Sequence, residues 1–365
     1  MEMNLDTIHP LQGCWDLALA SVKARALDAA IQRGIFGFLK NPATAEALAE
    51  FGRLDPVNTG HLLDLLWSMG VLTRRAGVGR AWVYGVDPKL AAFLVPGEEG
   101  YCGDALAHRL RSLRQFGAQL PGLLGAGAHA PQAPQAAGWA QAAEVQIGQE
   151  QGAVTAAAAL ACVGRLQGLG GARRFLDLGG GPGKVAVALA GAHPQWQGVV
   201  FDLPETAGVA QRIILRAGLG QRLESRGGDI GRDRIGAGYD LVWCSSVLHF
   251  LPEWPGVIAK IRDALVPGGY FVSVHAELPS ERDAAARVLP YYLPLLMRGR
   301  RVWPQGAMVD RMRELGFESI TSAALSYFPL APAQVVIGRR QVPRTGHQAE
   351  CAKRSISVMG CSGDA

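Results

Sequence analysis

The spacing of apolar residues changes near residue 174, and this change divides the chain into two regions. Before it, apolar residues recur at helical intervals, for example over residues 15–40, 45–51 and 56–69. After it, short apolar runs that suit buried strands alternate with segments of helical spacing. The pattern predicts an α/β fold with a doubly wound parallel sheet, preceded by a mostly helical region.

The apolar runs of the second region predict the strands of this sheet. We expect strands at residues 175–178, 198–201, 223–225, 239–244, 270–276, 317–323 and 333–338. Ligands of such sheets bind where the strands reach their carboxyl ends, so the residues that follow each strand are the first candidates for a site.

The first region is predicted to form a winged helix. Thr44 can cap a helix over residues 45–51, Asp55 and Pro56 can start another, and Trp82 begins the return strand of a hairpin. DNA binding is one interpretation, but the helix at 56–69 contains no Arg or Lys to contact phosphates or guanine edges. The alternative is that its excess of apolar residues faces a second copy of the chain.

A glycine motif follows the first strand of the second region. It reads Asp177-x-Gly179-x-Gly181-x-Gly183, and the next strand ends on Asp202. A phosphate-binding P-loop is excluded because its spacing is not met, and a dinucleotide fingerprint is weakened because no glycine stands at its third position. A tight turn without a ligand is the remaining alternative to a nucleotide site with a ribose.

This motif resembles the donor site of class I S-adenosylmethionine-dependent methyltransferases. The resemblance implies that the glycines let the backbone approach the donor, and that carboxylates take its ammonium and ribose groups. A Gly-Asp turn near residue 229 resembles the family turn whose acid lies by the adenine. The donor-binding residues implied are Asp177, Gly179, Gly181, Gly183, Asp202, Leu203, Asp229, Ile230 and Ser245.

The amino-terminal region resembles the dimerisation domain of the plant caffeate and bacterial polyketide O-methyltransferases. The resemblance rests on RGIFGFLKNPATAEALAE, NTGHLLDLLWSMGVLTRR and AFLVPGEEG. It implies a winged-helix dimerisation domain at 1–104 without a DNA role, and a Rossmann-like catalytic domain with a helical lid at 105–340. In that family the sheet has seven strands, one of them antiparallel. Residues 341–365 are polar and without periodicity, which predicts a disordered tail.

Five successive strand ends carry a glycine, an acid or an imidazole. They present Gly179, Asp202, Asp229, His249 and Glu277, and this recurrence predicts one site at that edge of the sheet. Histidine has an unperturbed pKa of ~6.5, which suits a general base for a hydroxyl acceptor.

The segment VLHFLPEW resembles the family segment VLHDWPDE, whose histidine deprotonates the acceptor. The resemblance therefore implies that His249 is the base and that Glu277 orients it. His275 is on the same face as Glu277 in a regular strand and is the reserve base, although a structural role is the simpler interpretation.

Two departures from the family pattern affect the base. Phe250 stands where an acid usually follows the histidine, and Val302 stands where many members have a second glutamate. These changes leave the base with one partner and make the pocket more apolar. Large flat side chains nearby suit an aromatic or conjugated acceptor; the candidates are Tyr291, Tyr292, Leu295, Met297 and Trp303.

Composition and charge add limits to this interpretation. The 365 residues carry a net charge of +5 that is scattered along the chain, so an acidic partner is not required. No secretory signal or apolar run of membrane-spanning length is present, and a cytoplasmic location is expected. The six cysteines form no C-x-x-C pair, so neither a zinc site nor a disulfide framework is indicated, and we assign no metal.

We therefore expect a homodimeric S-adenosylmethionine-dependent methyltransferase that acts on a hydroxyl of an aromatic small molecule and releases S-adenosylhomocysteine. Neither a nucleic acid nor a membrane is expected as a partner. Three alternatives stay open: transfer to carbon or nitrogen, a family member that has lost methyl transfer as some related hydroxylases have, and a winged-helix regulator.

Overall fold

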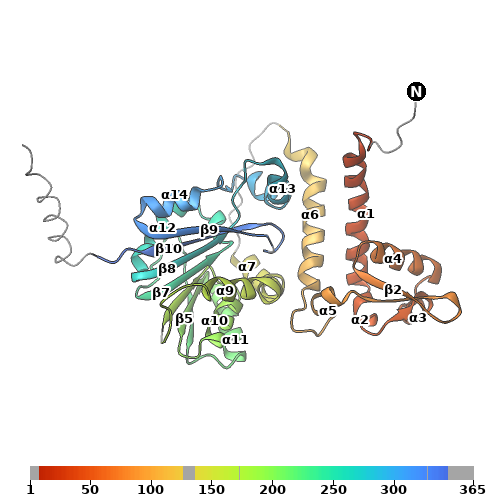
Figure 1. Ribbon diagram of the computed structural model, residues 1–365, viewed down its shortest axis with the longest axis horizontal. Coiled ribbons are helices and arrows are strands. Elements are labelled where there is room, and N and C mark those ends of the chain that lie inside the picture. The colour runs from red at the N-terminus through yellow and green to blue at the C-terminus, as the bar shows by residue number, and fades with distance from the viewer. Residues whose placement is uncertain (1–7, 126–135, 172, 327, 344–365) are drawn as a thin grey trace, which may run out of the picture. The chain divides into compact units, whose positions relative to one another are not determined.

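A computed structural model describes residues 8–125, 136–171, 173–326 and 328–343 of the chain (Figure 1). The chain divides into two compact units, one that ends at Ala161 and one that begins at Cys162. Nearly all of the predicted carboxyl-terminal tail lies outside the described residues, as does most of the stretch at 122–138, which is rich in Gly, Ala, Pro and Gln.

The amino-terminal unit consists of helices around a small antiparallel sheet with the strand order β1-β3-β2. Its elements are α1 (Gln12–Gln32), α2 (Ile35–Phe38), β1 (Ala43–Thr44), α3 (Ala45–Gly52), α4 (Pro56–Ser68), β2 (Leu72–Ala76), η1 (Val78–Arg80), β3 (Trp82–Val86), α5 (Pro88–Leu94), α6 (Gly103–Leu123), α7 (Ala136–Ala142), η2 (Ala143–Ile147), α8 (Gly148–Glu150), η3 (Gln151–Thr155) and α9 (Ala156–Val163). Buried apolar residues from α2, α3 and α4, among them Phe36, Leu48 and Leu63, form its core.

The starts of α3 and α4 are capped as the sequence predicts. The Thr44 hydroxyl accepts from the Ala47 amide at 3.3 Å, and the Asp55 carboxylate accepts from the Asn58 amide at 2.7 Å. β2 and β3 pair antiparallel and form the predicted hairpin. The short strand β1, which pairs with β3, is not predicted by the sequence because two residues are too few to show a period.

Residues 136–163 form one helical run, although the apolar spacing of this part of the sequence by itself favours two helices, at 139–147 and 153–166. Two turns within it, η2 and η3, are π-helical. A π turn contains one residue more than an α turn and so rotates the buried face of the helix. The apolar residues of the whole run therefore do not follow a single helical period.

The carboxyl-terminal unit is a seven-stranded sheet with helices on both faces. Its elements are β4 (Arg174–Leu178), α10 (Lys184–Ala192), β5 (Gln197–Asp202), α11 (Pro204–Arg216), β6 (Leu223–Gly227), β7 (Tyr239–Ser245), η4 (Leu248–Phe250), α12 (Trp254–Ala264), β8 (Leu265–His275), α13 (Arg282–Leu296), α14 (Ala307–Glu314), β9 (Phe317–Leu325) and β10 (Ala333–Arg340). Figure 1 shows α10 and α11 on one face of the sheet and α12 and α14 on the other.

The strand order is β6-β5-β4-β7-β8-β10-β9, and β10 alone runs antiparallel to its neighbours. This confirms the predicted seven-stranded, doubly wound sheet with one antiparallel strand. The chain continues from β4 to β5 on one side and later returns to β7 on the other. The carboxyl ends of β4 and β7 therefore border the switch point, where open α/β sheets bind ligands.

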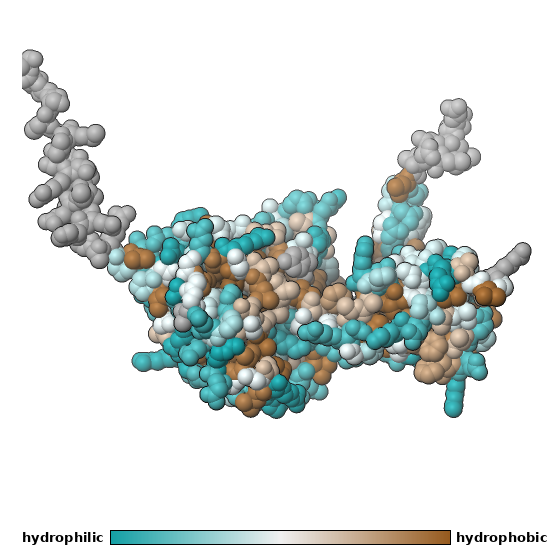
Figure 2. All heavy atoms as spheres, turned by 60° about the horizontal axis from the view of Figure 1, so that its bottom comes forward, coloured by the Kyte–Doolittle hydropathy of each residue, from teal (hydrophilic) through white to brown (hydrophobic). Residues whose placement is uncertain are grey.

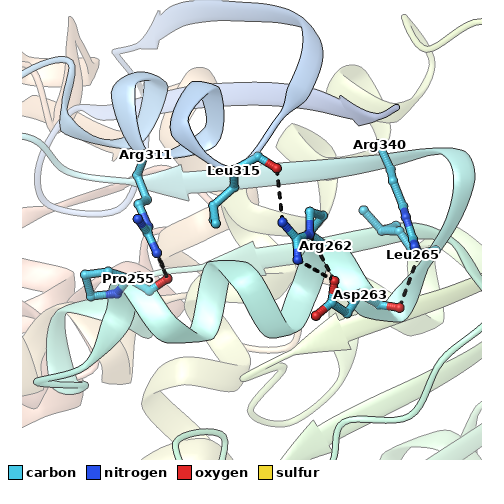
Figure 3. Close-up of polar contacts among 7 residues, drawn as sticks. All are labelled: Pro255, Arg262, Asp263, Leu265, Arg311, Leu315 and Arg340. Carbon is cyan, nitrogen blue, oxygen red and sulfur yellow. Dashed lines mark hydrogen bonds and ion pairs between the residues drawn. The ribbon is translucent and has the colours of Figure 1, made fainter. Parts of the chain in front are cut away.

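Three arginine side chains connect α14 and β10 to α12 and to the start of β8 (Figure 3). Arg311 of α14 donates to the Pro255 carbonyl, Arg262 donates to the Leu315 carbonyl, and Arg340 of β10 donates to the Leu265 carbonyl. These bonds join helix ends and strand ends that are 53 or more residues apart in the chain.

Figure 2 shows apolar residues exposed among hydrophilic ones on both units. Within the described residues, no helix combines the length and the apolar character that a membrane crossing requires.

Candidate active site

The glycine loop between β4 and α10 has a backbone that glycine alone adopts easily. Gly179, Gly181 and Gly183 have φ values of 70°, 58° and 76°, in the left-handed region. Gly180 is required for a different reason, because a Cβ there would lie 2.7 Å from the carboxyl carbon and Oδ2 of Asp177. The loop therefore passes directly over the Asp177 side chain.

Asp177, in the strand β4 before this loop, is a buried carboxylate with an unsatisfied oxygen. It is 2% exposed, and its Oδ2 has no hydrogen-bond partner among the described residues. Burial and, to a lesser extent, the nearby charge of Asp202 together raise the pKa of Asp177 to about 7, against a hydrogen bond from the Ala186 backbone that lowers it. A buried, unpartnered carboxylate oxygen fits a ligand that brings a cationic or donor group, such as the ammonium of the predicted methyl donor.

Asp202 ends β5 and leans across the glycine loop. Its Oδ2 accepts from the Gly181 amide at 2.8 Å, and its Oδ1 accepts from the Leu203 amide at 2.7 Å. Burial raises the pKa of Asp202 while these two bonds lower it. Each oxygen keeps a further lone pair, so the carboxylate is oriented by the backbone and can still accept from ribose hydroxyls.

The other predicted donor residues lie at the neighbouring strand ends. The Asp229 carboxylate accepts from the Gly231 amide at 2.8 Å and remains half-exposed after β6. Ile230 beside it is buried, and its carbonyl accepts from Lys260 at 2.8 Å. Ser245 is the half-buried last residue of β7, the strand next to β4.

His249 is buried in the short turn η4 among three rings. Their centroids lie 4.5 Å away for Trp303, 5.1 Å for Tyr292 and 5.4 Å for His275. Neither ring nitrogen of His249 forms a hydrogen bond of normal geometry in the described chain. Burial lowers the pKa of His249 to about 4, and a weaker polar contact with the Arg301 backbone offsets only part of this effect.

Glu277 is buried near the same edge but does not bond to His249. Its carboxylate accepts from the Gly306 amide at 2.8 Å and from the Met308 amide at 3.0 Å, at the start of α14. At the end of β8 it is instead the ring of His275 that packs against His249. The structure therefore does not form the expected His249–Glu277 pair, and an orienting role of Glu277 stays a prediction.

Two of the five predicted acceptor residues lie beside His249 and three lie further out, among them the partly buried Leu295. Tyr292 and Trp303 are buried against its ring. Tyr291 packs edge-on against Tyr292 with centroids 4.9 Å apart. Met297 is half-buried just after α13.

Sequence reasoning missed two apolar residues of this region. Trp254 packs against Trp303 with centroids 4.4 Å apart and ring planes inclined by 38°. Val247 lies against the glycine loop, since a Cβ on Gly179 would come within 2.7 Å of its side chain. They are the first and last residues of the segment VLHFLPEW, but an apolar residue carries no chemical signature that separates it from ordinary core.

Comparison with known proteins shows which family the chain belongs to. Residues 135–302 match the O-methyltransferase domain, and residues 15–95 match the O-methyltransferase dimerisation domain. The chain is 32% identical over 276 residues to N,N-dimethyltransferase OxyT of Streptomyces rimosus, which covers 70% of this chain and 75% of that protein. The chain belongs to the O-methyltransferase family. It is thus an S-adenosylmethionine-dependent methyltransferase, as the glycine motif implies.

Other relatives span more of this methyltransferase at lower identity. The 8-O-methyl transferase TcmO of tetracenomycin polyketide synthesis in Streptomyces glaucescens is 25% identical over 354 residues, 89% of this chain and 95% of that protein. The crystal structure of human N-acetylserotonin methyltransferase has a TM-score of 0.73 at 18% identity and covers 93% of this chain and all of that one. That likeness concerns the fold.

The boundary between domains is not decided by these matches. The dimerisation match ends at residue 95, and the compact units divide after Ala161. The helices α6 to α8 lie between these two positions. The boundary predicted after residue 104 therefore stays a prediction.

Proposed function

We propose that this methyltransferase transfers a methyl group to a hydroxyl oxygen of a small aromatic or conjugated molecule that binds beside His249. The observation that carries the proposal is the pairing of two sites on one sheet edge. One is the glycine loop over the orphaned oxygen of Asp177, and the other is the imidazole of His249 with Tyr292 and Trp303 around it.

The residues of the glycine loop would hold the donor. Asp177 would face its ammonium group and Asp202 its ribose, while Asp229, Ile230 and Ser245 lie at neighbouring strand ends. S-adenosylmethionine supplies an electrophilic methyl group that is displaced directly, so the chain has to align the acceptor and exclude water.

His249 would take the acceptor proton at one of its ring nitrogens. With a pKa of about 4 the ring is neutral at pH 7 and its lone pair is available. The imidazolium that forms would have no carboxylate partner, since Glu277 is bonded to the start of α14. A phenol with a pKa of ~10 would give up its proton reluctantly, so the site favours a more acidic hydroxyl.

An amine acceptor is the second candidate, and the same observation favours it. A neutral amine already presents its lone pair and needs no base before it attacks the methyl group. The relative OxyT is named as an N,N-dimethyltransferase. An amine acceptor would make the isolated, neutral His249 a wall of the pocket rather than a base.

Calorimetry with S-adenosylhomocysteine tests the donor site. We expect binding at micromolar strength or better, loss of binding in Asp202→Ala, and at least a ~10-fold weaker affinity in Gly180→Ala, whose new methyl group would collide with Asp177. Gly208→Ala in α11 is the matched control, because a Cβ there meets nothing within 4 Å. Unchanged affinity in Asp202→Ala would remove that residue from the donor site.

A panel of matched hydroxyl and amine acceptors tests the reaction, with methylated products identified by mass spectrometry. If His249 is the base, His249→Ala lowers turnover of a hydroxyl acceptor by ~100-fold or more with little change in donor affinity. If the acceptor is an amine, the variant loses much less activity. If neither the hydroxyl acceptors nor the amine acceptors are methylated, the proposal is rejected.

The amino-terminal unit supports a homodimer as part of this proposal. It contains the matched dimerisation domain, and α1 exposes Trp15, Leu17 and Val22 in the single chain. Nucleic acid is not proposed as a partner, since α4 has no Arg or Lys. The cytoplasmic location stays a prediction.

A further inference from the structure

His275 makes three polar contacts at the end of β8. Its Nε2 lies 3.3 Å from the amide nitrogen of Val247 and 3.2 Å from that of Leu248. Its Nδ1 lies 2.9 Å from the Ser273 hydroxyl oxygen. The ring is 2% exposed, so these contacts replace water almost completely.

The two amides decide the protonation of this ring. A backbone N–H can only donate, so Nε2 has to be the unprotonated, accepting nitrogen. The proton of the neutral ring is then on Nδ1 and is donated to Ser273. Burial lowers the pKa of His275 well below its usual value, which keeps the ring in this neutral form.

The amides that His275 accepts from open the turn that carries His249. The strand β7 ends at Ser245, and η4 begins at Leu248. The first N–H groups of a helical turn have no partner inside the turn, and a buried one without a partner costs about 1–3 kcal/mol. His275 therefore acts as a cap for this turn from a strand 27 residues further along the chain.

The same turn also touches the donor loop. Val247 lies against Gly179, at the distance of 2.7 Å from a Cβ placed there. Ser246 before it has a φ of 54°, a left-handed value that serine adopts at some cost. A turn with this backbone needs outside support, and its displacement would move both His249 and the wall of the glycine loop.

We propose that His275 is the positioning residue of the methyl-transfer site, because its Nε2 accepts from Val247 and Leu248 and so holds the turn that bears His249 against the donor loop. This inference rests on the proposed function for its effect on turnover. The hydrogen bonds of His275 can be tested in the protein alone, without a methyl donor or a methyl acceptor.

The first experiment measures the tautomer. In protein labelled with ¹³C-histidine, the Cδ2 chemical shift distinguishes a proton on Nδ1 from one on Nε2, and the His275 signal is identified by its loss in His275→Gln. We expect the proton on Nδ1. A proton on Nε2 would overturn the proposal, because that nitrogen could not accept from the two amides.

The second experiment compares His275→Gln with His275→Leu. The glutamine carbonyl can replace Nε2 as an acceptor, whereas leucine fills space without one. Hydrogen exchange in peptides that contain Val247 and Leu248 should accelerate at least ~10-fold in the leucine variant and stay near wild type in the glutamine variant. His193→Leu is the control, because His193 stacks on Trp196 outside the site.

The same variants connect the turn to catalysis. With an acceptor from the panel above, we expect kcat to fall by ~100-fold in His275→Leu with a KM within a few-fold of wild type, and to recover at least ~10-fold in His275→Gln. If His275→Leu does not fold, the tautomer and the glutamine variant still decide. A glutamine variant as impaired as the leucine variant would overturn the proposal. Failure of the wild type to bind S-adenosylhomocysteine would reject the proposed function instead.

Discussion

Burial removes the water around both Asp177 and His249, and it therefore disfavours the charged form of each side chain. For the acid this raises the pKa to about 7, and for the base it lowers the pKa to about 4. Near pH 7 the site thus contains a carboxyl group that is partly protonated and an imidazole that is neutral. Each of these states can be measured.

Donor binding should release a proton from Asp177. The ammonium group of S-adenosylhomocysteine would favour the ionised carboxylate, so at pH 7 binding should displace about half a proton. Calorimetry in two buffers of different ionisation enthalpy measures this number. In Asp177→Asn the release should disappear and the affinity should fall. Equal heats in both buffers for the wild type would contradict the raised pKa.

His249 should make the protein less stable as the pH falls. Its folded pKa of about 4 lies below the ordinary value of ~6.5, so the unfolded chain binds more protons between these two pH values. Full stability is present above about pH 6.5, and about 3 kcal/mol is lost by pH 4. Between pH 7 and pH 5, urea unfolding should show His249→Gln gaining about 2 kcal/mol relative to wild type. A constant difference between the two proteins would show that His249 is not desolvated as described.

At the scale of elements, Glu277 links the end of β8 to the beginning of α14. The residue before this helix, Gly306, has no side chain to cap it, and Glu277 accepts from two amides there instead. A carboxylate at a helix start also interacts favourably with the helix dipole. A second contact next to it holds the segment that begins with Trp303: the Leu278 amide donates to the Trp303 carbonyl at 2.7 Å.

Replacing Glu277 should therefore affect stability before it affects donor binding. We expect Glu277→Ala to cost about 1–3 kcal/mol in thermal or urea unfolding, with S-adenosylhomocysteine affinity within a few-fold of wild type. Glu281→Ala, which removes an exposed cap at the start of α13, is a matched control with a smaller cost. A loss of turnover in Glu277→Ala with no loss of stability would instead support the orienting role that the sequence predicts.

At the scale of the whole molecule, the first turns of α1 make few contacts within the single chain. Trp15, Leu17 and Val22 are 48%, 75% and 57% exposed, although each is a large apolar side chain. Large apolar residues exposed on one helix are typical of an interface, and a second copy would bury them.

Sedimentation should therefore give twice the mass of one chain. Leu17→Glu combined with Val22→Glu should shift the protein toward the monomer at micromolar concentration, because each charge would be buried in the interface. Lys23→Glu, a change between charged residues on the same helix, serves as the control. A wild-type protein that sediments as a monomer would contradict the proposed homodimer.

Both the sheet and the glycine loop can be predicted from the amino-acid sequence, because each produces a short local pattern of residues. Strand runs followed by helical spacing predicted the order of elements, and alternate glycines with flanking acids predicted a loop that needs left-handed backbone. The strand boundaries were less exact, since β8 begins at Leu265 and not at the predicted residue 270, and it passes Gly268 with a shift in register.

Which side chains contact His249 depends on how distant parts of the chain pack together in the fold. Glu277 and His275 stand two residues apart on the same predicted face, and no local pattern separates the one that caps a helix from the one that supports the turn. That choice depends on where α14 and the η4 turn pack, which is set by contacts between residues about 30 apart in the chain. For the same reason the sequence could name Tyr292 and Trp303 as pocket residues but not show that their rings bury His249, because burial is a property of the folded chain.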